Sequence, residues 1–518
     1  MKTTIKSLLL FFLALQAWGQ SGKNLSRSTP AEEGVSSAGI MAFLDAVGDS
    51  KHELHSLMIL RHGKVIAEGW WEPYGPDIKH TMYSVSKSFT ATAIGFAVAE
   101  GKLTVNDKVI AFFPNDLPEK VSPNLEALHI KDLLSMSVGH GKDPTSDVLH
   151  TDNWVASFLK YPIVHEPGTK FVYNTAATYM LSGIIQKVTG ETVLDYLTSR
   201  LFGPLGIGGI DWEKDPKGVN TGGYGLRLKT EDMAKFGQLF LQKGEWQGKR
   251  LLPEAWIEEA SSKKILQDPE APKEKVDASD WLQGYAYQMW RSRHDSYRAD
   301  GAFGQFILIL PEKDAVIIIT SETPDLQGEL DLVWEYLLPS FDMDLPKNAA
   351  ISDQQLQEKL EKLSIEPLQS EPNVALQQQI SGNYYQLAEN DKADAISLSF
   401  TEETCELIID QGGNSHPFSF GSGEWVMGET ARKGPYLVSR AKGALEGLDP
   451  FKVAGSYAWK DEQILELQLK YIESPHTETI RIVFEDDEKI TLDFESILNR
   501  NAERKLIEGK AVEIIAAY

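Results

Sequence analysis

The sequence of 518 residues is poor in cysteine and in basic residues. Its single cysteine, Cys405, cannot form an internal disulfide, so packing alone must stabilise the fold. Lys and Arg number 51 against 75 Asp and Glu, which leaves a net charge of −24. Such a surface repels phosphate backbones and anionic lipids, so the sequence argues against nucleic acid as a partner. With 42% hydrophobic and 24% charged residues, the chain nevertheless has the composition of an ordinary folded protein.

Long hydrophobic runs are also missing beyond the N-terminus. The apolar run 8–15 is preceded by two lysines and followed by Ala17 and Gly19 at small-residue positions. A charged start, a short apolar block and small residues before a cleavage site are typical of a secretory signal. We therefore expect a signal peptide over residues 1–19 and a mature protein exported to the periplasm or the extracellular space. No later run reaches the roughly 18 apolar residues of a membrane span.

The main part of the chain mixes strand patterns with helical ones. A strand pair turns at residues 62–63, a helix ends at Gly101, and a second strand pair turns at residues 312–314. These patterns predict an α/β or α+β domain over residues 25–341. The polar, proline-containing stretch 342–375 predicts a linker with a short helix.

The last part of the chain, residues 376–518, predicts an all-β domain. Apolar and polar residues alternate in several short stretches, for example at Leu465, Leu467 and Leu469. Such strands close into a small antiparallel barrel or a sandwich, and we expect a barrel-like accessory domain. We interpret its inward stripe, which includes Cys405, as plain core rather than a ligand cavity. The chemistry should not require this domain unless it covers the cleft.

Several common catalytic motifs are absent. The sequence has no GxSxG elbow, no HExxH zinc helix, no GxxxxGK[ST] phosphate loop and no CxxC pair. Its 11 histidines are scattered singly, so nothing in their spacing indicates a metal site.

The sequence does contain SVSK, from Ser84 to Lys87, at the start of a predicted helix. Residues three apart share a helix face, so the Lys87 amine lies beside the Ser84 hydroxyl, and the positive helix N-terminus favours a developing alkoxide. This arrangement makes a serine nucleophilic without a histidine. An isolated SxxK match is also typical of a helix-capping serine followed by a solvated lysine.

Four further motifs follow SVSK in a fixed order. They are IKDLLSMSVGH from Ile130 to His140, PGTKFVY from Pro167 to Tyr173, GGYGL from Gly222 to Leu226, and RADGAFGQ from Arg298 to Gln305. Together they resemble the serine β-lactamase and penicillin-binding-protein-like hydrolase superfamily, in particular its class C β-lactamase, DD-peptidase and family VIII esterase branch. The resemblance covers roughly residues 30–340 and implies an α/β (α+β) domain with an antiparallel sheet flanked by helices.

The resemblance implies a role for each matching residue. Ser84 would be the acylated nucleophile and Lys87 the group that shares its proton. Tyr173 would relay protons as a phenolate that a neighbouring lysine cation favours. The oxyanion hole would consist of the backbone N–H groups of Ser84 and Ala302. Gly301 would let the substrate approach its strand closely.

Two positions depart from the family pattern. Thr175 stands where the family has asparagine, and Ala299 stands where it has the lysine or histidine that helps to bind a substrate carboxylate. Arg298 is adjacent in sequence, but on a strand it points to the opposite face. Asp300 would repel a carboxylate. We therefore assign substrate binding to Thr175, Asp300 and Gly301, and we expect a neutral ester or amide to be cleaved better than a β-lactam or a peptidoglycan peptide.

These observations predict an exported serine hydrolase that cleaves an ester or amide through an acyl-enzyme, without a metal or organic cofactor. Its substrate would be a small ester, amide or peptide. A DD-peptidase or a true β-lactamase is the alternative within the same superfamily. A non-catalytic protein of the same fold that binds peptidoglycan or a protein partner is the alternative from another class, because a fold alone does not establish an activity.

Overall fold

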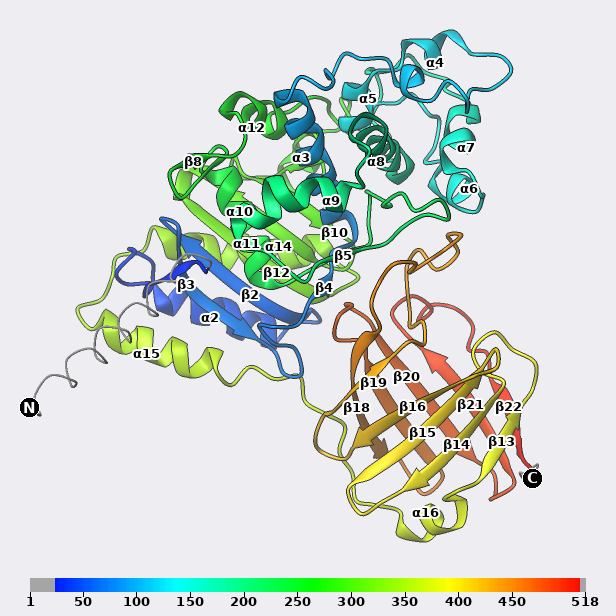
Figure 1. Ribbon diagram of the computed structural model, residues 1–518. Coiled ribbons are helices and arrows are strands. Elements are labelled where there is room, and N and C mark those ends of the chain that lie inside the picture. The colour runs from blue at the N-terminus through cyan, green and yellow to red at the C-terminus, as the bar shows by residue number, and fades with distance from the viewer. Residues whose placement is uncertain (1–23, 513–518) are drawn as a thin grey trace, which may run out of the picture.

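The computed structural model describes residues 24–512 of the protein (Figure 1). The predicted signal peptide, residues 1–19, lies outside the described residues. None of the helices in the described part has both the length and the apolar character needed to span a membrane.

The first part of the chain is built on a seven-stranded sheet of order β1-β3-β2-β12-β11-β10-β9, in which all pairs except β1–β3 are antiparallel. Both predicted strand pairs are confirmed: β2 turns into β3 at residues 62–63, and β11 turns into β12 at residues 311–314. The strands are β1 (Ser26–Arg27), β2 (Glu53–Arg61), β3 (Lys64–Trp70), β9 (Trp290–Arg291), β10 (Tyr297–Gly301), β11 (Gln305–Leu310) and β12 (Ala315–Glu322).

Helices cover both faces of this sheet. In β12, Val316 and Ile318 pack into one apolar cluster, whereas Ile317 and Ile319 pack into another. A strand buried on both faces is apolar at nearly every position, which explains why β12 shows no alternation of apolar and polar residues. The first face carries α3 (Ser86–Ala99) and α11 (Thr230–Leu241), and the second carries α2 (Ser37–Gly48) and α14 (Leu326–Leu332).

Helix α3 is the central helix of this first part of the chain, which we call the catalytic part because it carries the predicted catalytic residues. All its residues from Ser86 to Ala97 are buried, as expected for a helix surrounded by other elements. Further helices and two small sheets complete this part. They are α4 (Pro123–Ala127), α5 (Ile130–Leu134), α6 (Thr145–Leu149), α7 (Trp154–Lys160), α8 (Thr175–Thr189), α9 (Val193–Leu197), α10 (Gly203–Leu205), α12 (Glu254–Ser261), α13 (Lys273–Asp277), β4 (His80–Thr81), β5 (Asp211–Trp212), β6 (Leu226–Leu228), β7 (Glu245–Trp246) and β8 (Lys249–Arg250).

The last part of the chain is a closed β-barrel, which settles the choice between barrel and sandwich. Its strands follow the order β16-β15-β14-β13-β22-β21-β20-β19-β18, and a contact between Gly421 of β16 and Ser456 of β18 closes the ring. Cys405, Leu465, Leu467 and Leu469 are buried in its core. The strands are β13 (Tyr384–Leu387), β14 (Ala395–Phe400), β15 (Thr404–Gln411), β16 (Asn414–Gly421), β17 (Val426–Thr430), β18 (Phe451–Trp459), β19 (Ile464–Lys470), β20 (Thr477–Phe484), β21 (Lys489–Glu495) and β22 (Ile507–Ala511).

The stretch expected to be a linker contains α15 (Ala349–Leu360) and leads to α16 (Val374–Ile380). Leu356 and Leu360 of α15 are buried in the same apolar cluster as α2, so this helix is packed onto the catalytic part of the chain. The chain leaves α15 at one side of the molecule and enters the barrel beside α16 (Figure 1).

Buried polar contacts join the barrel to the catalytic part. The Tyr83 hydroxyl lies 2.6 Å from Nε2 of His476, and the Tyr436 hydroxyl donates to Glu213 at 2.5 Å. Arg227, which is fully buried, donates to Glu473 at 3.3 Å. These partners lie in the loop between β17 and β18 and in the turn between β19 and β20. The loop rises from the barrel toward α6 (Figure 1).

The interface predicts that the catalytic part does not function alone. A chain truncated after Leu345 loses the partners of Tyr83, Glu213 and Arg227 and exposes the apolar surface around them. We expect it to be insoluble, or soluble with a lower melting temperature and without turnover of p-nitrophenyl acetate. Solubility, thermal melting and ester turnover of the truncated and full-length chains are compared. A truncated chain with full activity would contradict the prediction.

Candidate active site

Ser84 and Lys87 meet at the start of the central helix. Ser84 lies in the single 3₁₀ turn Tyr83–Val85, which leads directly into α3. The Lys87 amine Nζ is 3.1 Å from the Ser84 hydroxyl and donates to the carbonyl oxygen of Gly223 at 2.7 Å. The hydroxyl therefore has an amine beside it and the positive end of α3 close to it, as the SxxK spacing predicts.

Lys87 is deeply buried, with only 1% of its surface exposed. Burial disfavours the ammonium form and lowers the pKa of Lys87 to about 7, although the carboxylates of Asp143 and Asp300 oppose this change. A large fraction of the amine is thus uncharged at neutral pH. An uncharged amine next to a serine hydroxyl is able to accept its proton.

Tyr173 lies just before α8 and close to Lys87. Its ring centre is 5.1 Å from Lys87 Nζ, and the ring stacks on Trp290 at a centroid distance of 5.6 Å. Burial raises the pKa of Tyr173 above its ordinary value, and a hydrogen bond with Ser84 only partly opposes this. The expected phenolate is therefore disfavoured. Burial penalises a phenolate as it penalises an ammonium, so the raised pKa favours the neutral phenol.

Asn174, which follows Tyr173, caps the N-terminus of α8. Asn174 is fully buried; its side-chain oxygen accepts from the Ala177 N–H at 3.0 Å, and its Nδ2 lies 2.9 Å from His140 Nδ1. This amide is thereby fixed at the N-terminus of α8. Thr175 instead lines the cavity next to Ser84.

The strand β10 carries the third motif, and its two charged residues pair with each other. Ala299 is a buried alanine and supplies no cation, and Arg298 donates to Asp300 at 2.8 Å. Burial raises the pKa of Asp300, whereas Arg298 lowers it. Neither Asp300 nor Gly301 is among the residues that line the cavity. Asp300 is held in an ion pair with Arg298, and its assignment to substrate binding stays a prediction.

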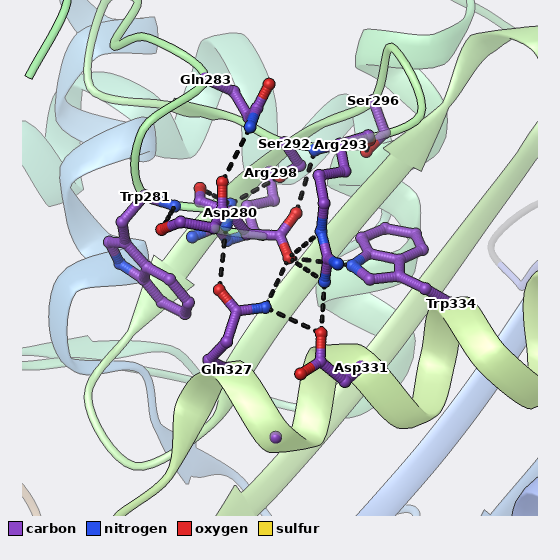
Figure 2. A network of polar contacts seen from close by, with 12 residues as sticks. Asp280, Trp281, Gln283, Ser292, Arg293, Ser296, Arg298, Gln327, Asp331 and Trp334 are labelled. Carbon is purple, nitrogen blue, oxygen red and sulfur yellow. Dashed lines mark hydrogen bonds and ion pairs between the residues drawn. The ribbon is translucent and has the colours of Figure 1, made fainter. Parts of the chain in front are cut away.

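Figure 2 shows the polar network to which Arg298 belongs. Arg298 donates to the backbone oxygen of Asp280 at 3.0 Å, and the Asp280 carboxylate accepts from Arg293 at 2.8 Å and from the Trp334 indole at 3.0 Å. Gln327 donates to the same carboxylate at 2.8 Å. The network holds the side of β10 that carries Arg298 in place, and it pairs the buried charged side chains with groups of opposite sign.

Gly301 allows two backbone segments to approach each other. A Cβ atom on Gly301 would lie 2.4 Å from the carbonyl oxygen of Met82 and 2.8 Å from Cβ of Gln305. The glycine therefore brings β10 against the turn that carries Ser84. Its expected contact with the substrate stays a prediction. Ala302 follows directly and lines the cavity together with Ser84.

The cavity at Ser84 has a volume of about 360 Å³ and two walls of different origin. The catalytic part supplies Ser84, Asp143, Thr175 and Ala302, and the loop between β17 and β18 supplies residues 437–441. Sequence reasoning missed this second wall. The only signal was a break in the strand pattern, residues 431–450, which contains glycine, proline and basic residues and no apolar alternation.

Tyr83, the residue before Ser84, was also missed. Its φ angle of 43° lies in the left-handed region, which costs a bulky residue about 1–3 kcal/mol. Its ring stacks on Tyr436 at 5.7 Å, and its hydroxyl contacts His476. Two barrel residues therefore hold the turn in the conformation that presents Ser84.

A metal centre finds no support in this geometry. Among residues 24–512, no group of three or more His, Cys, Asp or Glu side chains is arranged to hold a metal ion.

Comparison with known proteins identifies similar chains. A family model described as Beta-lactamase matches residues 47–338. The 6-aminohexanoate-dimer hydrolase of Paenarthrobacter ureafaciens is 25% identical over 293 residues, which cover 52% of this chain and 73% of that protein. Protein flp of Staphylococcus aureus strain MW2 is 29% identical over 167 residues, which cover 29% of this chain and 33% of flp.

Solved structures are similar to this chain at low sequence identity. A beta-lactamase candidate from Bacteroides dorei DSM 17855 is 16% identical with a TM-score of 0.50, over 59% of this chain and 98% of that one. The octameric penicillin-binding protein homologue from Pyrococcus abyssi is also 16% identical, with a TM-score of 0.47, over 91% of this chain and 99% of the other.

The pKa of Lys87 predicts an acid limb in the pH profile. Below a pH of about 7 the amine is protonated and cannot accept the Ser84 proton, so kcat/KM for an uncharged ester should fall tenfold per pH unit. Above that pH it should level off. Asp143→Asn removes a carboxylate that raises the pKa of Lys87, so it should move the limb to lower pH. Lys87→Arg should be inactive throughout, because a guanidinium stays protonated.

The pH profiles of kcat/KM for the wild type and both variants test this assignment. A limb that Asp143→Asn leaves in place, or an active Lys87→Arg protein, would show that another group accepts the proton.

The close approach at Gly301 predicts a catalytic defect for Gly301→Ala. The added methyl group meets the Met82 carbonyl and pushes β10 away from the turn of Ser84. We expect kcat/KM to fall by one to two orders of magnitude, roughly the effect of an ångström of misplacement. Gly208→Ala is the matched control, because a Cβ atom there meets nothing within 4 Å. Ester kinetics and thermal melting of both variants are measured, and equal activities would contradict the prediction.

Proposed function

The chain belongs to the Beta-lactamase family, and from that premise we propose that it is a serine hydrolase that cleaves an ester or amide through an acyl-enzyme at Ser84. One observation carries this proposal. The Ser84 hydroxyl lies 3.1 Å from an amine whose pKa is lowered to about 7 by burial. A serine and a base within hydrogen-bond reach are the parts that nucleophilic catalysis needs.

In the acylation step, the Ser84 oxygen attacks the substrate carbonyl carbon and its proton passes to Lys87. The backbone N–H groups of Ser84 and Ala302 stabilise the oxyanion of the tetrahedral intermediate. The carbonyl re-forms as the C–O or C–N bond breaks, and the leaving group takes a proton from the Tyr173 phenol. Lys87 returns a proton to Tyr173, so the site is neutral again once the acyl-enzyme has formed.

Deacylation reverses these transfers with water as the nucleophile. Lys87 accepts the proton of the attacking water through Tyr173, the Ser84–acyl bond breaks, and Ser84 regains its proton. The product leaves as a carboxylic acid. Every step uses groups of the chain itself and one water molecule.

An ester or amide without a carboxylate next to strand β10 suits the site best. Ala299 offers no cation there, and Arg298 is held in its ion pair with Asp300. The relative named as a 6-aminohexanoate-dimer hydrolase acts, by its name, on a dimer of an amino acid. Two amino acids joined head to tail contain an amide, which favours a linear amide among the substrates of this chain.

We also propose that the mature protein is exported, on the strength of the predicted signal over residues 1–19. This proposal does not depend on the contacts between the barrel and the catalytic part or on the cavity at Ser84. Cell fractionation of a producing bacterium, followed by N-terminal sequencing, tests it.

Loss of the nucleophile should abolish turnover. The protein should hydrolyse p-nitrophenyl acetate and react with a fluorophosphonate probe, and Ser84→Ala should lower kcat/KM at least about a thousandfold with little change in melting temperature. The exposed Ser199→Ala serves as the matched control and should remain active. The peptide labelled by the probe should contain Ser84.

Two outcomes would contradict the proposal. Absence of both turnover and labelling in the wild type would favour a non-catalytic binding protein of this fold. Turnover of nitrocefin or of a D-Ala-D-Ala peptide at least as efficient as that of the ester would favour a β-lactamase or DD-peptidase.

A further inference from the structure

The turn between β10 and β11, residues 302–304, carries the backbone N–H group of Ala302 that the proposed mechanism uses in the oxyanion hole. Phe303 and Gly304 have φ angles of 67° and 94°, so two consecutive residues adopt the left-handed region. For a bulky residue such as phenylalanine this conformation is strained, and it persists only where neighbouring groups hold it. The groups that hold this turn therefore also decide where the Ala302 N–H points.

Strand β12 supplies the group that holds the turn from behind. The Ser321 hydroxyl lies 2.9 Å from the carbonyl oxygen of Phe303 and 3.1 Å from that of Gly304, and it donates to this pair. Just beyond the strand, the Thr323 N–H donates to the same Phe303 carbonyl at 3.1 Å. A serine hydroxyl has a single proton and two lone pairs. Ser321 can thus support the turn only while its proton points toward these carbonyls.

A carboxyl group lies beside the Ser321 hydroxyl. Glu329 of α14 is 1% exposed, and neither of its carboxyl oxygens has a hydrogen-bond partner of good geometry among residues 24–512. A Cβ atom on Gly304 would overlap with both the Ser321 hydroxyl oxygen and Oε2 of Glu329, so these two oxygens lie close together over the glycine. The missing side chain of Gly304 lets the acid reach the turn.

The surroundings of Glu329 disfavour a carboxylate. Burial raises its pKa well above the ordinary range of a glutamate, the carboxylates of Asp300 and Asp325 raise it further, and the Ser321 hydroxyl opposes the rise. The charged and titratable groups packed around this end of α14 are Asp300 with its partner Arg298, Asp325 with its partner Lys51, and His52, whose pKa burial lowers. Both cations are already paired, and burial favours the neutral imidazole. The acid form of Glu329, which has a proton to donate, is therefore favoured at neutral pH.

We propose that Glu329 is a positioning residue for the oxyanion hole and that it donates its acid proton to Ser321 Oγ. Ser321 then directs its own proton to the carbonyl of Phe303, and the turn that presents the Ala302 N–H is fixed. An ionised Glu329 would accept the Ser321 proton instead, because a charged acceptor forms the stronger hydrogen bond. The turn would lose that support. The inference rests on the proposed function and deepens it, because it explains how the oxyanion hole is held.

Two substitutions separate the proton of this side chain from its volume. Glu329→Leu removes the donor but fills the buried space, so kcat for p-nitrophenyl acetate should fall at least about tenfold, with KM within about twofold of the wild type. The reason is that the oxyanion forms only in the steps that turn the ester over. Glu329→Gln keeps a donor at this position and should retain kcat within about threefold. The leucine variant should melt no lower than the wild type, because it lacks a buried polar group without a partner.

The pH dependence provides a readout that a packing role would not change. Because the pKa of Glu329 is raised in the folded protein, the folded state binds one more proton than the unfolded state between about pH 5 and that pKa. The unfolding equilibrium constant of the wild type should thus rise up to about tenfold per pH unit relative to that of Glu329→Gln. Urea unfolding at several pH values measures this ratio. The kcat of the wild type should also decline as Glu329 ionises at high pH, and the glutamine variant should lack this decline.

Ser321→Ala tests the hydrogen bond from the other side. Loss of the hydroxyl should lower kcat about as much as Glu329→Leu does. The protein with both substitutions should lose little more than either single variant, because both changes break the same interaction. Glu335→Leu is the matched control, since Glu335 is an exposed glutamate in the helical turn Val333–Leu337 that follows α14, and it should keep wild-type kinetics.

The outcomes distinguish this inference from the proposed function. A Glu329→Leu protein with wild-type kcat, a glutamine variant as impaired as the leucine variant, or independent losses in the double variant would overturn the positioning role and leave the hydrolase assignment intact. Absence of ester turnover in the wild type would overturn the proposed function. Infrared difference spectra of the wild type and Glu329→Gln then still report on the acid. A carbonyl band of a protonated carboxyl group at neutral pH supports the proton on Glu329, and its absence overturns the inference.

Discussion

The burial of one amine governs the catalytic part of this structure. To keep Lys87 away from water beside Ser84, helix α3 must be covered on every side, and the carbonyl of Gly223 must supply a neutral acceptor rather than a carboxylate. A lysine pKa near 7 in place of one near 10.5 corresponds to a penalty on the order of 5 kcal/mol against the charged form. That penalty favours an uncharged amine beside the Ser84 hydroxyl at neutral pH. Burial of Tyr173 likewise raises the pKa of its hydroxyl and favours the phenol.

Local patterns were sufficient to predict much of the fold. The turn at residues 62–63, the helix that ends before Gly101 and the alternation at Leu465, Leu467 and Leu469 all depend on neighbours in sequence. The adjacency of Ser84 and Lys87 follows from a single helical turn.

What the sequence could not provide depends on distant contacts. The phenolate expected at Tyr173 rested on a lysine cation, but the burial that neutralises that lysine arises from helices far apart in the chain. The role of Gly301 depends on the Met82 carbonyl, more than two hundred residues earlier. The wall formed by residues 437–441 comes from a loop without periodicity, and no local rule assigns such a loop to a partner surface.

The contact between Tyr83 and His476 links positions 393 apart in sequence. Because the first precedes the nucleophile and the second lies in a barrel turn, the barrel is part of the geometry of the serine itself. Recombination with a related hydrolase at the segment before α16 would separate the two residues and leave the strained tyrosine without its support. Chimeras of this protein therefore need the catalytic part and the barrel from one parent, or a paired exchange at both positions.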